Sequence, residues 1–172
     1  FFANGVAPGD QAPGLAFAVV VAVAHVAGLL AVQPATVLGS SVVPVLGDST
    51  ALTTVLLLLV TAVVVAPAGL HLTAAIQTVT LLLTVDDRAG VSETVQVVAY
   101  ATAPCALACL PFPMVRTVCV LYGAALLIGG LTIVHGTTLP RATVAAALPA
   151  TFVFGVAYGG LWAGETATAL AG

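Results

Sequence analysis

The stretch from Leu15 to Val32 reads LAFAVVVAVAHVAGLLAV and contains no charged residue. As a helix it is about long enough to cross the ~30 Å hydrocarbon core of a bilayer. Of the 172 residues, 61% are hydrophobic and only 5% are charged, whereas a soluble domain usually carries about a quarter charged residues. So few charges could not coat a soluble surface. The sequence therefore predicts an all-α integral membrane protein.

Four further apolar stretches predict a bundle of about five transmembrane helices. The second, from Thr50 to Val85, exceeds the length of one straight span, and we expect a single long helix kinked at Pro67, because proline lacks a backbone donor and crowds the preceding turn. Division into two spans at Pro67 stays open. The other predicted spans are Glu93 to about Leu110, Val118 to Val134, and Ala142 to Trp162, the last interrupted by Pro149.

A hydrophilic loop, Asp86-Asp87-Arg88-Ala89-Gly90, holds the one charge cluster. We expect Ser92 to cap a helix that begins at Glu93, because a serine hydroxyl accepts an orphan N–H and an acid favours the helix N-terminus. On that helix Glu93, Gln96 and Tyr100 share one face. We expect this face to point toward protein.

His71 and Gln77 of the long helix, with Glu93, Gln96 and Tyr100 of the next, form the candidate buried polar cluster. The two groups flank the Asp86 loop, which makes them antiparallel neighbours. A transport or proton-relay interpretation uses His71 and Glu93 as the titrating pair and predicts a hydrated cavity at mid-depth. The structural alternative, which we favour, leaves Glu93 hydrated or capping near the interface.

Two successive G-x-x-x-G patterns occupy the last predicted span. They consist of Gly155 and Gly159, then Gly160 and Gly164. Such patterns let helix backbones approach closely in lipid, as a homodimer seam or, the alternative we favour in a chain with 17 glycines, against a neighbouring helix of the same chain.

Several classes of function are excluded or lack candidate residues. Three Arg without Lys provide no basic stripe for nucleic acid. Motifs for catalysis, a metal or a cofactor are missing, so we expect no enzyme. Cys105, Cys109 and Cys119 are interpreted as reduced packing residues and His25 as a satisfied packing histidine.

Orientation follows from the arginines. With five spans and a cytoplasmic N-terminus, Arg88 and Arg141 lie in the cytoplasm and Arg116 outside, a two-to-one vote under the positive-inside rule. We expect one membrane domain over residues 1–172. Because the first residue is Phe1, we also expect further residues upstream.

The segment Ser92–Pro104, SETVQVVAYATAP, resembles a signature of the Yip1 domain family. Agreeing features are His71, Leu121-Tyr122-Gly123, Gly129-Gly130-Leu131, His135 and Arg141-Ala142. The N-terminal Phe1–Asp10 is similar to the haloarchaeal branch. The resemblance implies five spans with a cytoplasmic N-terminus. Eukaryotic relatives act in vesicle trafficking with small GTPases, and we expect this chain to lack the cytoplasmic domain that would carry such contacts.

These observations lead us to expect a non-enzymatic, multi-pass protein of the cell membrane, acting as a scaffold or membrane-organising partner. Its expected partners are the lipid bilayer and other membrane proteins or a second copy of itself. A small transporter or channel subunit is the alternative from a different class. An accessory subunit of a larger membrane complex is the third possibility.

Overall fold

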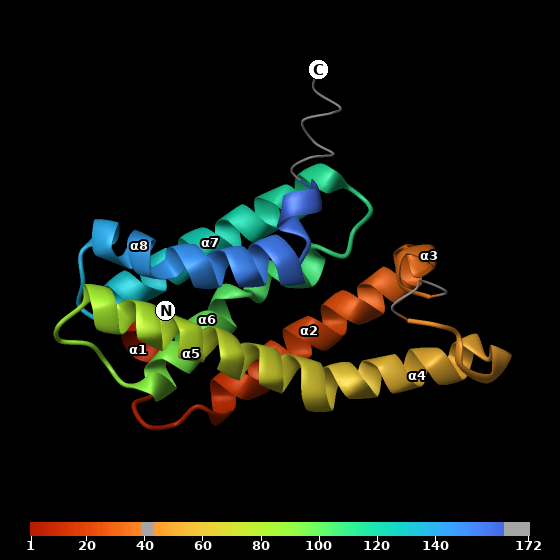
Figure 1. Ribbon diagram of the computed structural model, residues 1–172, viewed down its shortest axis with the longest axis horizontal. Helices are drawn as coiled ribbons and strands as arrows, with labels where there is room; N and C mark the ends of the chain where they lie inside the picture. Colours follow the sequence, from red (N-terminus) through yellow and green to blue (C-terminus); the bar gives the residue numbers. More distant parts are fainter. Residues whose placement is uncertain (39–42, 164–172) are drawn as a thin grey trace, which may run out of the picture.

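The computed structural model describes residues 1–38 and 43–163, and these residues form helices without a strand. Four helices within them are long and apolar enough to cross a membrane. They are α2 (Ala12–Val32), the continuous helix Thr50–Thr84, α7 (Pro113–Val134), and Leu139–Ala157, which comprises α8 and a π-helical end. They run roughly along one common axis (Figure 1). The all-helical membrane prediction is thus confirmed, and the count of about five spans stays a prediction.

The long second helix consists of α4 (Thr50–Val60), the π-helical segment η2 (Thr61–Val65) and α5 (Ala66–Thr84). Ser49 caps it by accepting a hydrogen bond from the Leu52 N–H at 3.2 Å. Its predicted continuity is confirmed. The irregularity lies directly before Pro67, because proline crowds the carbonyl four residues earlier and a wider π turn accommodates this. A kink at Pro67 stays a prediction.

The third predicted span is wrong as a single long helix. It consists of α6 (Val91–Ala101), only 11 residues long, followed by the 3-10 helix η3 (Ala103–Leu107). Pro104 explains the break, since proline ends the regular helical hydrogen bonding. The cap is also wrong: Gly90 precedes the first helical residue, and the Ser92 hydroxyl is buried without a hydrogen-bond partner among the described residues.

The last two membrane-length helices begin earlier than predicted. α7 starts at Pro113 and α8 (Leu139–Ala150) has Pro140 in its first turn, where a missing N–H costs nothing. After Pro149 the chain continues as the π-helical segment η4 (Thr151–Ala157). Gly159, with a φ of 73°, adopts the left-handed conformation that ends a helix.

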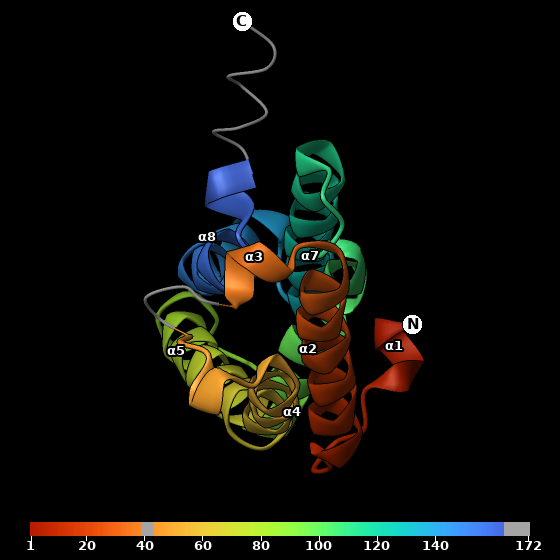
Figure 2. The ribbon, with the colours of Figure 1, turned by 90° about the vertical axis from the view of Figure 1, so that its right-hand side faces the viewer.

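The short α6 lies at the centre of the bundle, as the end-on view suggests (Figure 2). It contacts α2, α5 and α7, and most of its side chains are buried. Close approach depends on glycine: a Cβ on Gly14 would lie 3.0 Å from the Gln96 backbone, and one on Gly130 would lie 2.8 Å from Val97. The core is thus built from small and β-branched residues.

Three short helical elements lie at the two ends of the bundle. They are α1 (Phe2–Gly5), α3 (Pro34–Val37) and the 3-10 turn η1 (Leu46–Asp48). We call the end with the loops 85–90 and 135–138 the Arg88 end, where the Ala89 N–H donates to His135. We call the opposite end the Arg116 end. There the end of α2 is joined to the turn before α7, because Gln33 Nε2 donates to the Cys109 carbonyl at 2.8 Å.

Candidate functional site

The structure does not bring the five predicted polar residues together. His71 is exposed, and its Nδ1 lies 2.8 Å from the Pro67 carbonyl oxygen of its own helix. Gln77 is fully buried and points at α8, where its Nε2 donates to the Ala145 carbonyl at 3.1 Å. These two residues therefore share no partner, although they belong to the same helix.

The three candidates on α6 have separate partners as well. Gln96 pairs twice with the backbone of Ala7, donating at 2.7 Å and accepting at 3.0 Å. Tyr100 packs edge-on against Phe1 and Phe17, with ring centroids 5.0 and 5.3 Å apart. Glu93 is half-buried in the first turn of α6, beside Gly90. These contacts tie the N-terminal segment to the bundle and line no common cavity.

The glycine patterns do not lie on one continuous helix. Gly155 belongs to η4, but the helix ends at Ala157 and Gly159 has positive φ. Gly160 packs tightly within the chain, since a Cβ there would lie 2.6 Å from the Phe154 carbonyl oxygen and 2.9 Å from Val120. Gly164 lies outside the described residues.

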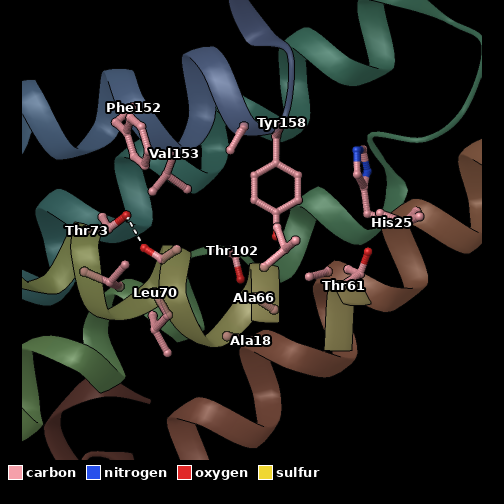
Figure 3. Close-up of a pocket in the computed structure, with 16 residues that line it drawn as sticks. Ala18, His25, Thr61, Ala66, Leu70, Thr73, Thr102, Phe152, Val153 and Tyr158 are labelled. Atoms are coloured by element: carbon pink, nitrogen blue, oxygen red, sulfur yellow. Dashed lines mark hydrogen bonds between the residues drawn. The ribbon is translucent and has the colours of Figure 1, made fainter. Parts of the chain in front are cut away.

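A cavity of about 270 Å³ opens between α2, η2 and α5, α6, and η4 (Figure 3). Both π-helical segments contribute to its walls, with Thr61 and Val65 on one side and Val153 and Ala157 on the other. Most of the atoms that line it are apolar.

His25 and Tyr158 are the aromatic polar residues of this cavity, and their rings pack edge-on with centroids 5.0 Å apart. The hydroxyl of Tyr158 is paired with that of Thr102, toward which it points in Figure 3. The His25 side chain is only 7% exposed, and its Nδ1 has no hydrogen-bond partner among the described residues. The prediction of a buried histidine is confirmed, but this nitrogen is unsatisfied.

A second polar group lies at the Arg88 end, where His135 follows α7 and is buried. Its Nδ1 accepts a hydrogen bond from the Ala89 N–H at 3.2 Å, and its Nε2 lies 3.4 Å from the Thr94 hydroxyl oxygen. Accepting at Nδ1 requires the neutral ring. Burial holds the pKa of His135 below its usual value; Glu93 opposes this shift and Arg88 adds to it. The neutral imidazole of His135 thus holds the loop 85–90 against the end of α7.

Sequence reasoning missed the cavity because its lining is mostly apolar. It treated His25 as satisfied, and it did not single out Tyr158, which lies within the Gly155–Gly159 pattern. The available signal was an isolated histidine inside a charge-free span, because ionisable groups there are costly and often functional. The spacing of the two rings, which are 133 residues apart (158 − 25), gives no hint of contact. The three cysteines are buried and free, as predicted.

The helices and their apolar outer faces define a multi-pass helical membrane protein. The Yip1 domain matches residues 1–160, and the chain belongs to this family. No curated protein and no solved structure matches it.

Proposed function

We propose that this Yip1-domain chain is a non-enzymatic, membrane-organising protein that holds a partner membrane protein against the outer face of α4 and η2. We call this face, made of Val55, Leu59 and Val63, the partner face. The proposal rests on how weakly α4 is anchored in the bundle. A scaffold and an accessory subunit of a larger complex both need such a face.

The anchoring of α4 is slight because Thr53 is its only buried residue. The adjoining η2 also has a single buried residue, Thr61, and packs against α2. Both hydroxyls donate to carbonyls of the same helix, Thr53 to Ser49 and Thr61 to Leu57. Neither hydroxyl donates to a neighbouring helix. Outside its own helix and the adjoining turn, α4 contacts mainly α2. In Figure 1 it extends past α7 and α8 beside α2 alone. A helix placed this way is free to pack against another protein.

The partner face is chemically suited to helix packing in lipid. Side chains there are aliphatic, and most are about half exposed or more. Association of membrane helices depends on van der Waals packing rather than on a hydrophobic driving force. Aliphatic residues without charge meet that requirement, and they also leave the face stable when it contacts lipid alone.

The family resemblance and the ends of the bundle support an orientation. α6 and η3 carry the chain from the Arg88 end to the Arg116 end, so we propose five crossings with the fifth made by these short helices. Arg88 and Arg141 then share the side of the N-terminus, which the positive-inside rule assigns to the cytoplasm of a cell membrane. The haloarchaeal affiliation of residues 1–10 is part of the same proposal.

Site-specific photo-cross-linking in the native membrane tests the partner face. A photoreactive amino acid replaces Val55, which is 62% exposed, and in a control variant it replaces Leu121 on α7, which is 65% exposed. We expect a discrete cross-linked protein from position 55 and only lipid adducts from position 121. Identical patterns from the two positions would remove the basis for a partner face on α4.

A further inference from the structure

We propose that the cavity between α2, α5, α6 and η4 binds one membrane lipid, which enters sideways from the bilayer. One hydrocarbon chain of the lipid extends along Leu70 and Val153, and the headgroup lies beyond the His25 end of the cavity. This lipid site is independent of the partner face on α4.

The shape of the bundle creates a side entrance. α5 and α8 pack closely where Gln77 and Thr80 reach Ala145. Farther along, α5 and η4 are hardly in contact, and the cavity lies where they separate. Phe152 and Val65, which line the cavity, are also exposed on the outer surface. Because this surface is apolar, its surroundings in the membrane are lipid tails.

The walls favour a hydrocarbon chain over water. Thr61, Thr73 and Thr102 line the cavity, but each hydroxyl donates to a carbonyl within its own turn. The cavity therefore offers water few of the partners that a buried water needs. At about 270 Å³ it exceeds an apolar cavity of ~150 Å³, which stays dry and binds benzene. An empty space of this size would forfeit many packing contacts.

One end of the cavity is different, because the two aromatic polar residues His25 and Tyr158 line it. The ring of Tyr158 lies against His25, and Arg116 approaches Gly159 next to that tyrosine. His25 precedes the end of α2 by seven residues (32 − 25), which is about 10 Å along a helix. The polar end therefore faces the Arg116 end of the bundle.

This arrangement matches an amphipathic molecule in length and polarity. A headgroup at the membrane surface of the Arg116 end keeps its charge in water, and the chain continues past His25 toward Leu70.

Gly69 supplies a variant that fills the cavity without a clash. It lines the cavity, and a Cβ added there would have no neighbour within 4 Å. Gly129 on α7 has equally open space and does not line the cavity. Gly69→Leu and Gly129→Leu are therefore matched changes, one inside the lipid site and one outside it.

The test uses the full chain in phosphatidylcholine vesicles that contain a phosphatidylcholine with a diazirine midway along one acyl chain. After irradiation, mass spectrometry locates the adducts. In the unsubstituted chain we expect adducts on the buried lining residues Ala18 and Val98. Labelling at these positions falls about tenfold or more in Gly69→Leu. Gly129→Leu labels like the unsubstituted chain.

Native mass spectrometry of the unsubstituted chain in mild detergent is a second measurement that needs no variant, and we expect one retained lipid per chain. Adducts confined to outward-facing residues, or interior labelling in the Gly69→Leu chain equal to that of the unsubstituted chain, would overturn the proposal. A chain that retains no lipid would do the same. The cross-linking result at Val55 has no bearing on these outcomes.

Discussion

The backbone carbonyl of Ala145 in α8 accepts hydrogen bonds from two side chains of a neighbouring helix. Residue 149 is proline and has no N–H, so the usual donor four residues later is missing. Thr80 Oγ1 and Gln77 Nε2, both from α5, lie 2.7 and 3.1 Å from this oxygen. We predict that the two side chains replace the missing donor jointly, so that either one alone largely suffices.

The expected magnitudes follow from these contacts. Thr80→Val removes the shorter bond, and hydrogen bonds between membrane helices contribute ~0.6 kcal/mol on average and at most about 1.7 kcal/mol. Gln77→Leu removes the longer bond, the 3.2 Å donation from Nε2 to the Thr80 hydroxyl, and an Oε1 that has no partner, so its cost is about zero to 0.5 kcal/mol. The double variant leaves Ala145 without a side-chain donor, which adds roughly 1–2 kcal/mol beyond the sum of the single changes.

The assay is a double-mutant cycle on the unfolding of the purified protein in detergent, with unfolding driven by a denaturing detergent. Thr78→Val is the matched control, because the Thr78 hydroxyl donates only to Ala74 of its own helix. A Pro149→Ala background restores the missing N–H and should reduce the excess cost of the double variant. Additivity within about 0.5 kcal/mol in the natural background would refute joint replacement of the proline's donor.

Three further predictions concern other contacts. Gly28→Ala places a Cβ against Cys109 Sγ, so we expect a loss of about 1–3 kcal/mol in unfolding free energy, measured in the same detergent assay. Gln96→Leu breaks both bonds to Ala7, and limited proteolysis should then cut within residues 1–11 faster while the bundle stays intact. Burial keeps the pKa of His135 below 6.5 in the folded chain, so acidification below pH 6.5 protonates the unfolded chain first. Thermal stability in detergent should therefore fall with decreasing pH, by at most about 1.4 kcal/mol per pH unit for this one group, and the His135→Gln chain should lose that pH dependence.

The fold was predictable wherever the sequence contained a long apolar stretch. α2, the helix Thr50–Thr84 and α7 each coincide with such a stretch, because the thickness of the bilayer sets the length of an apolar helix. The segment from residue 91 to 110 is equally apolar in part, yet it folds as two short helices. Hydropathy alone could not reveal this, since a buried short helix and a lipid-facing helix have similar composition.

The five residues of the predicted polar cluster have separate partners, because a shared helix face and proximity in the sequence do not determine contact. Gln77 and Gln96 were correctly expected to be buried, as side-chain amides in a membrane need partners. Their partners are backbone groups of Ala145 and Ala7, which lie far away in the sequence. Backbone acceptors have no sequence signal unless a proline nearby, such as Pro149, indicates a freed carbonyl.

The cavity has a cause that connects these observations. Its two facing walls contain the π-helical segments η2 and η4, and each lies next to a proline, Pro67 after the first and Pro149 before the second. A π turn widens a helix and displaces the residues that follow it. At Pro149 the helices are still held together by Gln77 and Thr80, whereas beyond it α5 and η4 separate. The prolines thus produce both the interhelical hydrogen bonds and the adjoining space, so a site for a lipid arises from backbone irregularity rather than from a cluster of polar side chains.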